Sequence, residues 1–234
     1  MGELLPLFPL STVLFPQMLL PLHIFEPRYR LLVRRSLDRE QPFGIVLIRS
    51  GVEGSGAAEP HLVGTSARIV GHSPLPDGRS YIVIRGERRF AIESFISAHP
   101  ERQAAPDAAQ RSTEPYLVGR VRYLEDDGAA DAADLAARAA DAYTEYLMAI
   151  AAASGEPRSE VPRLEATGDS TPHDVAYRVA AGLAIAADER QRLLEAPSAR
   201  ERLRAELRLL ERENSLLREL LLRLRVGGEA PRLN

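Results

Sequence analysis

The sequence predicts an α+β protein: a small, partly open and mostly antiparallel β-barrel with one early helix, followed by an α-helical bundle with a long C-terminal helix. Two observations predict this class. Short apolar segments separated by turn residues fill the first half of the chain, and from Ala130 the apolar residues recur at helical spacing. We therefore expect a β-barrel subdomain over 1–125, a helical bundle subdomain over 126–226 and a flexible tail over 227–234.

The most apolar stretch is Leu4–Arg30, which changes character after Phe25. Prolines interrupt its first part, and because each proline removes a backbone donor and clashes with the preceding turn, one long helix is excluded. Short strands with proline at their starts or edges fit instead. A helix is expected over Glu26–Leu37, because Pro27 suits a first helical turn. Its predicted buried face consists of Tyr29, Leu32, Val33 and Leu37.

Further strands are expected along the rest of the first half. They are Phe43–Arg49, Leu62–His72, Ser80–Arg85, Arg89–Ile96 and Tyr116–Leu124. Pro76-Asp77-Gly78 is a strong turn signal, and Gly86-Glu87 separates two of the strands. Phe90 and Ile92 are the expected inward residues of the second of these, Arg89–Ile96. The expected loops are Gly51–Gly56 and His99–Pro115.

The second half contains the helices. A helical stripe runs from Ala130 to about Ala153, and a loop over Ser154–Ser170 follows it. The next helix is expected to begin at Thr171, because a cap hydroxyl there precedes a proline and an acidic residue. A short helix over Asp188–Leu194 comes next, and Ser198 begins a capping-box pattern for the last helix.

The last helix, from Ala199 to about Arg225, shows a seven-residue repeat. The candidate self-association residues are Leu203, Leu207, Leu210, Asn214, Leu217, Leu221 and Leu224. One interpretation is a homodimer that pairs through this seam. The other is packing against the preceding helices of the same chain. Additional apolar residues favour it because they widen the apolar stripe: Leu209, Leu216, Leu220 and Leu222. Both remain open from the sequence.

Composition excludes several functions. The chain has 234 residues, no cysteine and no lysine, and all thirty of its basic residues are arginine. A P-loop ATPase, a Ser–Lys peptidase, a Schiff-base enzyme and a cysteine nucleophile are therefore excluded. The net charge of -3 does not indicate that the chain binds nucleic acid or an anionic membrane. The N-terminus lacks the basic start of a signal peptide, and no apolar run is long enough to span a membrane, so we expect a cytoplasmic protein with no membrane partner.

No catalytic, metal or cofactor site is expected. The five histidines are scattered without the short spacings of metal ligands. The glycine cluster Gly51–Gly56 is read as a loop, since no lysine follows it. Glu26, Arg28 and Arg30 could bind a ligand, although such residues more often form contacts at helix ends.

The sequence resembles the Lon protease N-terminal, substrate-binding domain. The resemblance begins with LLPLFPLSTVLFPQMLLPLHIFEPRYR (Leu4–Arg30). It continues in the same order through Phe43–Gly56, Val63–Gly71, Leu75–Ile92, Tyr116–Asp127 and Asp188–Leu203. The match is collinear over nearly the whole chain, so no single short motif carries it.

This resemblance implies a PUA-like β-barrel joined to a helical bundle. It implies a stand-alone, bacterial-type module that binds polypeptide clients or a partner protein without hydrolysing them. The ATPase and peptidase domains of full-length Lon are not expected in these 234 residues, which lack the lysine that both need. The candidate client-contact or family-signature residues are Phe15, Leu22, Phe25, Glu26, Tyr29 and Arg30.

The sequence allows two alternatives to client binding. An RNA-binding PUA-like module would need a basic strip, and the candidates for it are Arg85, Arg88, Arg89, Arg120 and Arg122. Aromatic residues make up only 6% of the chain, so stacking platforms are scarce and nucleic acid is not the favoured partner. The other alternative is a self-associating adaptor or regulator of a full-length protease.

Overall fold

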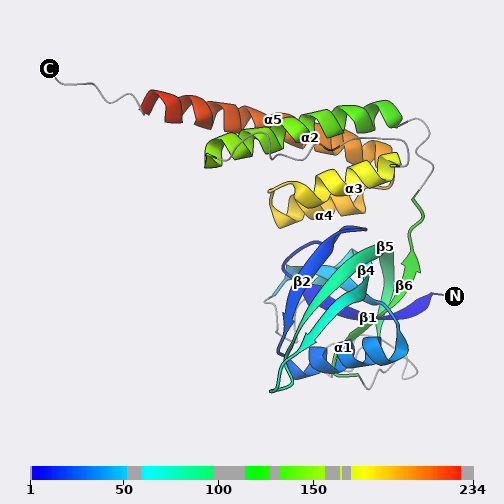
Figure 1. Cartoon of the computed structure of the whole chain (residues 1–234). Coiled ribbons are helices and arrows are strands. Elements are labelled where there is room, and N and C mark those ends of the chain that lie inside the picture. The colour runs from blue at the N-terminus through cyan, green and yellow to red at the C-terminus, as the bar shows by residue number, and fades with distance from the viewer. Residues whose placement is uncertain are drawn as a thin grey trace. The chain divides into compact units, whose positions relative to one another are not determined.

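The computed structural model describes residues 2–51, 59–96, 114–126, 132–155, 164 and 170–227, with side chains to residue 223 in the last range. Within these residues the chain is α+β, with six strands and five helices (Figure 1). The strands are β1 (Glu3–Leu10), β2 (Leu19–Ile24), β3 (Phe43–Ser50), β4 (Glu59–Pro74), β5 (Ser80–Ile96) and β6 (Leu117–Tyr123). The helices are α1 (Pro27–Arg39), α2 (Ala133–Ser154), α3 (Pro172–Gly182), α4 (Ala187–Glu195) and α5 (Ala199–Gly227). The predicted loops over 51–56 and 99–115 and the predicted tail over 227–234 lie almost entirely outside the described residues.

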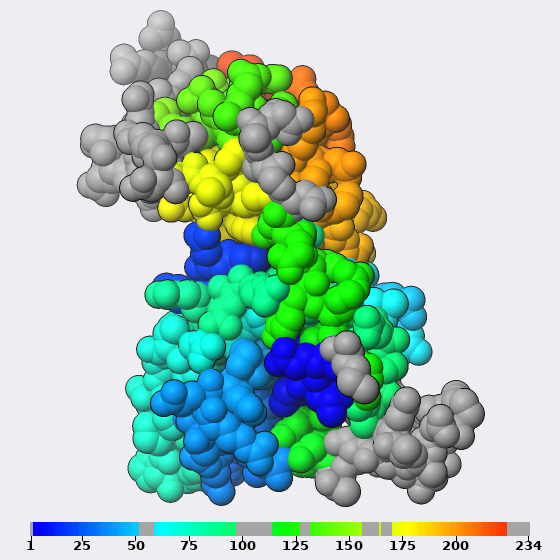
Figure 2. Space-filling model, turned by 90° about the vertical axis from the view of Figure 1, so that its right-hand side faces the viewer, coloured from blue at the N-terminus to red at the C-terminus, as the bar shows by residue number. Residues whose placement is uncertain are grey.

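The strands form one mostly antiparallel sheet in the order β2-β5-β4-β3-β1-β6. Only the β1–β3 pair is parallel among the described pairings. Figure 2 shows β1, in dark blue, beside its partner β6, in green. Because β5 also pairs with β6, the strands β5, β4, β3, β1 and β6 close into a ring. β2 is attached to this ring as an edge strand through β5.

One long strand, β5, replaces the two strands predicted over Ser80–Arg85 and Arg89–Ile96. The expected break at Gly86-Glu87 is a β-bulge: Ala67 pairs with Gly86 and Thr65 with Arg89, so Ser66 alone faces two residues of β5. The Ser66 hydroxyl accepts a hydrogen bond from the Arg88 N–H at 3.2 Å. The prediction of a break was wrong because a glycine inside a strand can mark a bulge as well as a turn.

The main core of the strand-containing part lies between α1 and the sheet. The rings of Phe8 and Tyr29 stack there with centroids 3.9 Å apart. α1 buries Tyr29, Leu32, Val33 and Ser36, which follow the spacing of one helical face. Leu37, predicted on that face, lies at the edge of the buried stripe and is 37% exposed.

By their contacts the residues divide into two compact units. The first contains Met1–Glu125 with Ala184–Glu195, and the second contains Asp126–Leu183 with Ala196–Asn234. By these contacts α4 belongs with the strands, whereas the apolar spacing predicts it as part of the helical bundle over 126–226. The Gln191 amide donates to the Val63 carbonyl at 3.0 Å, and Arg89 donates to the Leu194 carbonyl at 2.9 Å. These polar contacts attach α4 to the sheet. They could not be predicted from the spacing of apolar residues in the sequence.

In the second unit, α2 and α5 lie side by side and run in the same direction. The Asn214 amide donates to the Ala142 carbonyl at 3.1 Å, and one turn further along both helices Arg218 pairs with Glu145 at 3.3 Å. α3 begins with the predicted cap at Thr171, whose hydroxyl accepts from the Asp174 N–H within a full capping box.

The segment between β1 and β2 lies directly against β5. The Gly86 N–H donates to the Met18 carbonyl at 3.0 Å, and the Gln17 N–H donates to the Gly86 carbonyl at 2.8 Å. A Cβ on residue 86 would lie 2.2 Å from the Phe15 carbonyl oxygen. Glycine is therefore required at this point of β5, because two backbones meet there with no room for a side chain.

Glu206 is a fully buried carboxyl group in the second unit. Neither of its oxygens has a hydrogen-bond partner in the part of the chain that the structure describes. Burial raises the pKa of Glu206 well above its ordinary value of 4.5, while the nearby Arg202 charge acts in the opposite direction. Since the folded state retains this proton at a pH where the unfolded state releases it, stability is lost as the pH rises above about 4.5.

The Gly86→Ala substitution is expected to lower the free energy of unfolding by about 1–3 kcal/mol, because the added methyl group overlaps the Phe15 backbone. Urea unfolding measures this change. Gly71→Ala is the matched control: a Cβ there would be 3.5 Å from its nearest neighbour, and we expect a change of at most about 0.5 kcal/mol. Equal destabilisation by the two substitutions would contradict the packing described.

The Glu206→Gln substitution is expected to stabilise the chain in a pH-dependent way. The gain should grow from near zero below about pH 4 by on the order of 1 kcal/mol per pH unit, until the pKa of the folded state is passed. Unfolding curves at a series of pH values test this. Glu201→Gln, at an exposed position of the same helix, should show no such trend. A gain independent of pH would mean that Glu206 is ionised in the folded protein.

Candidate functional site

Exposed apolar side chains of the first unit gather at β2 and the adjoining part of β5. Leu19 is 53% exposed, Phe25 58% and Tyr81 54%. Pro21 and His23 of β2 are exposed as well. We call these five residues the β2 surface. Contiguous exposed apolar groups of this kind are typical of binding surfaces.

Three rings form a row across the β2 surface. His23 lies opposite Tyr81 in the β2–β5 register, and their ring centroids are 4.7 Å apart in a stacked arrangement. Along the chain from His23, the ring of Phe25 lies 5.7 Å from the His23 ring. The row therefore continues from β5 across β2 to the corner before α1. It offers flat apolar area whose few side-chain rotations lose little entropy on binding.

A small cavity of about 190 Å³ opens beside this row. Its lining includes the core residues Phe8, Ile24 and Tyr29, together with Leu22 and Phe25. A pocket for a drug-sized molecule is usually larger, from about 300 Å³ upward. This cavity is therefore suited to a single apolar side chain rather than to a small-molecule ligand.

The backbone of β2 is partly blocked against the addition of another strand. Because Met18 accepts from Gly86, the alternation of an antiparallel pair directs the backbone groups of Leu19, Pro21 and His23 away from β5. Proline has no N–H, so one donor of this open edge is missing. Proline at such a position blunts the edge pairing that an exposed strand otherwise invites. The side chains, more than the backbone, are therefore available for recognition.

The charged residues beside the β2 surface are engaged locally. Glu26 pairs with Arg28 at 2.9 Å, and the Arg28 guanidinium lies 4.5 Å from the centroid of the Tyr29 ring. Arg30 donates to the Asp77 carbonyl at 3.4 Å. This anchors α1 to the β4–β5 hairpin tip, where hydrogen bonds from Arg79 lower the pKa of Asp77. From the sequence, Glu26, Arg28 and Arg30 could either bind a ligand or form contacts at the helix end. The structure contains the helix-end contacts.

The predicted client-contact residues divide into core and surface. Phe15 is fully buried and Tyr29 is 5% exposed, so both support the fold. Leu22 is half-buried and lines the cavity, while Phe25 stands exposed at its mouth. Sequence reasoning missed Leu19, His23 and Tyr81. Their outward positions follow from strand alternation, but their meeting depends on a cross-strand register that the sequence does not display.

The arginines proposed for RNA binding do not form a free basic strip. Arg89 is buried and donates to α4, and Arg88 pairs with Glu125 at 3.2 Å. Arg120 donates to the Gly2 carbonyl and Arg122 pairs with Glu93 at 3.9 Å. Protein groups therefore occupy four of the five candidates, and Arg85 remains exposed beside the β2 surface.

The heptad residues of α5 pack within the chain. Leu203 and Leu210 are fully buried, and Asn214 is 5% exposed and bonded to α2. The remaining described members are half-buried: Leu207, Leu217 and Leu221. The side chain of Leu224 lies outside the described residues. Intramolecular packing accounts for the buried members, and pairing with a second copy stays a prediction.

The described residues contain no group of three or more His, Cys, Asp or Glu side chains that could hold a metal ion. The same residues include no helix with the length and apolar character of a membrane span. The first unit offers the β2 surface with its small cavity, and separately a pocket of about 500 Å³ whose lining includes His61, Leu62 and Phe95.

Comparisons with known proteins agree with this fold. Residues 4–212 match the family model described as the ATP-dependent protease La (LON) substrate-binding domain. The chain is 26% identical over 216 residues to a Lon protease of Anaeromyxobacter dehalogenans, covering 92% of this chain and 24% of that protein. A Lon protease 2 of Myxococcus xanthus is also 26% identical, over 224 residues, with the same two coverages. The chain thus spans about a quarter of the length of these curated relatives.

Two solved structures share the fold. One is a Lon N-terminal domain protein from Xanthomonas campestris, with 25% identity and a TM-score of 0.57 over 86% of this chain and 95% of that chain. The other is the N-terminal domain of a Mycobacterium avium complex Lon protease, with 19% identity and a TM-score of 0.59 over 91% and 98%. With a family model that covers most of its length, this chain belongs to the Lon substrate-binding domain family.

Proposed function

We propose that this chain is a non-catalytic module that binds exposed apolar segments of polypeptide clients on the β2 surface. The observation that carries the proposal is the row of three rings, Tyr81, His23 and Phe25, beside a cavity of side-chain size. Membership of a substrate-binding domain family supports it. The clients bind here without being cleaved, because the 234 residues lack the lysine of a P-loop and of a Ser–Lys dyad.

The expected affinity is modest. Burying a large apolar side chain completely contributes roughly 1.5–3 kcal/mol, and Leu19, Phe25 and Tyr81 are already about half buried. Their sum is comparable to the entropy lost on association, so a single contact gives weak and reversible binding. Reversible binding of many sequences suits a module that recognises unfolded chains by apolar content.

No second function is proposed. An RNA-binding module would need the basic strip whose arginines are mostly engaged by protein groups. The adaptor role and the cytoplasmic location remain predictions from the sequence. The division into a β-barrel over 1–125 and a helical bundle over 126–226 also stays a prediction from the sequence. The β2 surface lies in the first unit, which by its contacts also contains α4.

The triple substitution Leu19→Ser, Phe25→Ser and Tyr81→Ser is expected to weaken client binding at least about tenfold. The reason is that it removes most of the exposed apolar area of the β2 surface. The probe is fluorescein-labelled α-lactalbumin, reduced and carboxymethylated so that it stays unfolded. Fluorescence anisotropy gives its Kd, and circular dichroism verifies that the variant remains folded.

Leu4→Ser is the matched control, since Leu4 is 52% exposed on β1, outside the β2 surface. Its Kd should equal that of the unaltered chain. The proposal fails if the triple variant binds as tightly as the control, or if the folded form of α-lactalbumin binds as well as the unfolded form.

A further inference from the structure

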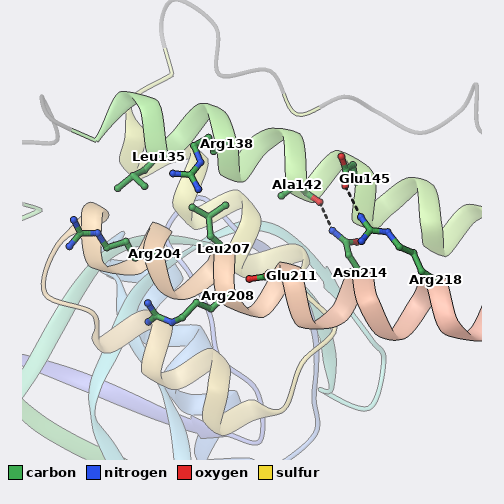
Figure 3. Close-up of a pocket in the computed structure, with 10 residues that line it drawn as sticks. All are labelled: Leu135, Arg138, Ala142, Glu145, Arg204, Leu207, Arg208, Glu211, Asn214 and Arg218. Atoms are coloured by element: carbon green, nitrogen blue, oxygen red, sulfur yellow. Dashed lines mark hydrogen bonds and ion pairs between the residues drawn. The ribbon is translucent and has the colours of Figure 1, made fainter.

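A groove of about 660 Å³ lies between α2 and α5 in the second unit (Figure 3). Its apolar part comes from Leu135 and Ala142 of α2 and from Leu207 of α5. The volume falls within the range of about 300–1,000 Å³ that is usual for ligand sites. None of the residues of the β2 surface lines this groove.

Arginines dominate the charge of the groove, outnumbering its carboxylates by four to two. Arg218 pairs with Glu145 at 3.3 Å, which neutralises one charge of each sign. Glu211 is the other acidic residue. Three exposed arginines, Arg138, Arg204 and Arg208, remain without an ion pair among the residues that the structure describes.

The arrangement of these arginines is unfavourable without a partner. Arg204 and Arg208 are four positions apart on one helix, where like charges repel each other. Figure 3 shows Arg138 extending from α2 toward Leu207 of α5, so a third positive charge reaches the same groove. The whole chain carries a net charge of -3, and this concentration of positive charge is therefore a local feature. An anionic ligand would relieve the repulsion.

We propose that the α2–α5 groove binds an acidic segment of another protein. Carboxylates of the segment pair with Arg138, Arg204 and Arg208, whose planar guanidinium groups can each hold a carboxylate through two hydrogen bonds. An apolar side chain between the acidic residues packs on Leu135 and Leu207. The ligand is therefore a polypeptide stretch in which Asp or Glu alternates with Leu-like residues.

The lining favours a polypeptide over a nucleic acid. None of the described residues that line the groove is aromatic, so unpaired bases find no stacking surface. Glu145 and Glu211 would lie close to a phosphate backbone and repel it. Leucine side chains suit the apolar residues of a peptide.

The test measures binding of a short fluorescein-labelled peptide of alternating Glu and Leu residues to the full chain. Anisotropy is recorded at ionic strengths of about 0.01 M and about 0.15 M, because screening weakens exposed ion pairs. Arg204→Glu with Arg208→Glu is expected to raise the Kd at least about tenfold at low salt. The same variant should gain affinity for the peptide in which Lys replaces Glu.

Arg34→Glu with Arg178→Glu is the matched control. Both arginines are exposed, lie outside the groove and undergo the same change of charge. The control should bind the acidic peptide like the unaltered chain, and both double variants should retain binding of unfolded α-lactalbumin, which separates this site from the β2 surface.

The proposal is overturned by any of three results: no binding of the Glu–Leu peptide at low salt, an equal loss in both double variants, or equal affinity for the peptide with Gln in place of Glu. A structured RNA that binds more tightly than the peptide and is lost in the groove variant would assign the groove to nucleic acid instead.

Discussion

The close approach of the Phe15 backbone to Gly86 is the constraint on which the first unit depends. Two backbones meet where any Cβ would come within 2.2 Å of a carbonyl oxygen. The hydrogen bonds of Gly86 with Gln17 and Met18 then set the point at which β2 begins to pair with β5. Since a shift of one residue would exchange the two faces of a strand, this contact decides which side chains reach solvent. The apolar β2 surface is thus a consequence of a glycine in the neighbouring strand.

The second unit depends on a different kind of constraint. Leu203, Leu210 and Asn214 attach α5 to the rest of the unit by burial and by one amide hydrogen bond to α2. Asparagine at such a position favours one register, because a shift would leave its amide buried without a partner. The same register brings Arg218 to Glu145, and it places Arg138 of α2 along the same groove as Arg204 and Arg208 of α5, which have no ion pair among the described residues. The register of α5 against α2 therefore determines both the packing and the charge pattern of the groove.

Much of the fold can be predicted from short-range sequence patterns. The capping box at Thr171 and the inward Phe90 and Ile92 follow from short-range patterns, and the structure contains them. The candidate site depends on contacts between distant segments. Phe15 and Phe25 both lie in one proline-rich apolar stretch, yet one is fully buried and the other 58% exposed. Phe25 follows β2, whose pairing with β5 begins beside Gly86, more than sixty positions away from Phe25 along the chain. The residues around each ring therefore do not reveal which of the two is exposed.

Side-chain hydrogen bonds explain why α4 lies in the first unit, although the sequence predicts it in the helical bundle. α4 has an ordinary helical pattern, and nothing in its apolar spacing separates it from the helices around it. Gln191 and the carbonyl of Leu194 tie it to β4 and β5, and such bonds between a side chain and a distant backbone have no periodic signature. The chain therefore leaves the first unit after β6 and returns to it for α4 before α5 begins.

The two proposed binding surfaces, the β2 surface and the α2–α5 groove, differ in how strongly they select among polypeptide sequences. Apolar contact on the β2 surface is nearly indifferent to sequence, so it can accept many unfolded chains and select little among them. Ion pairing in the α2–α5 groove depends on the sign and spacing of charges, so it adds little free energy at physiological salt but discriminates between segments. A polypeptide with both apolar and acidic stretches meets both requirements through separate segments. Selectivity in such a module would then come from the groove, and general affinity for unfolded protein from the β2 surface.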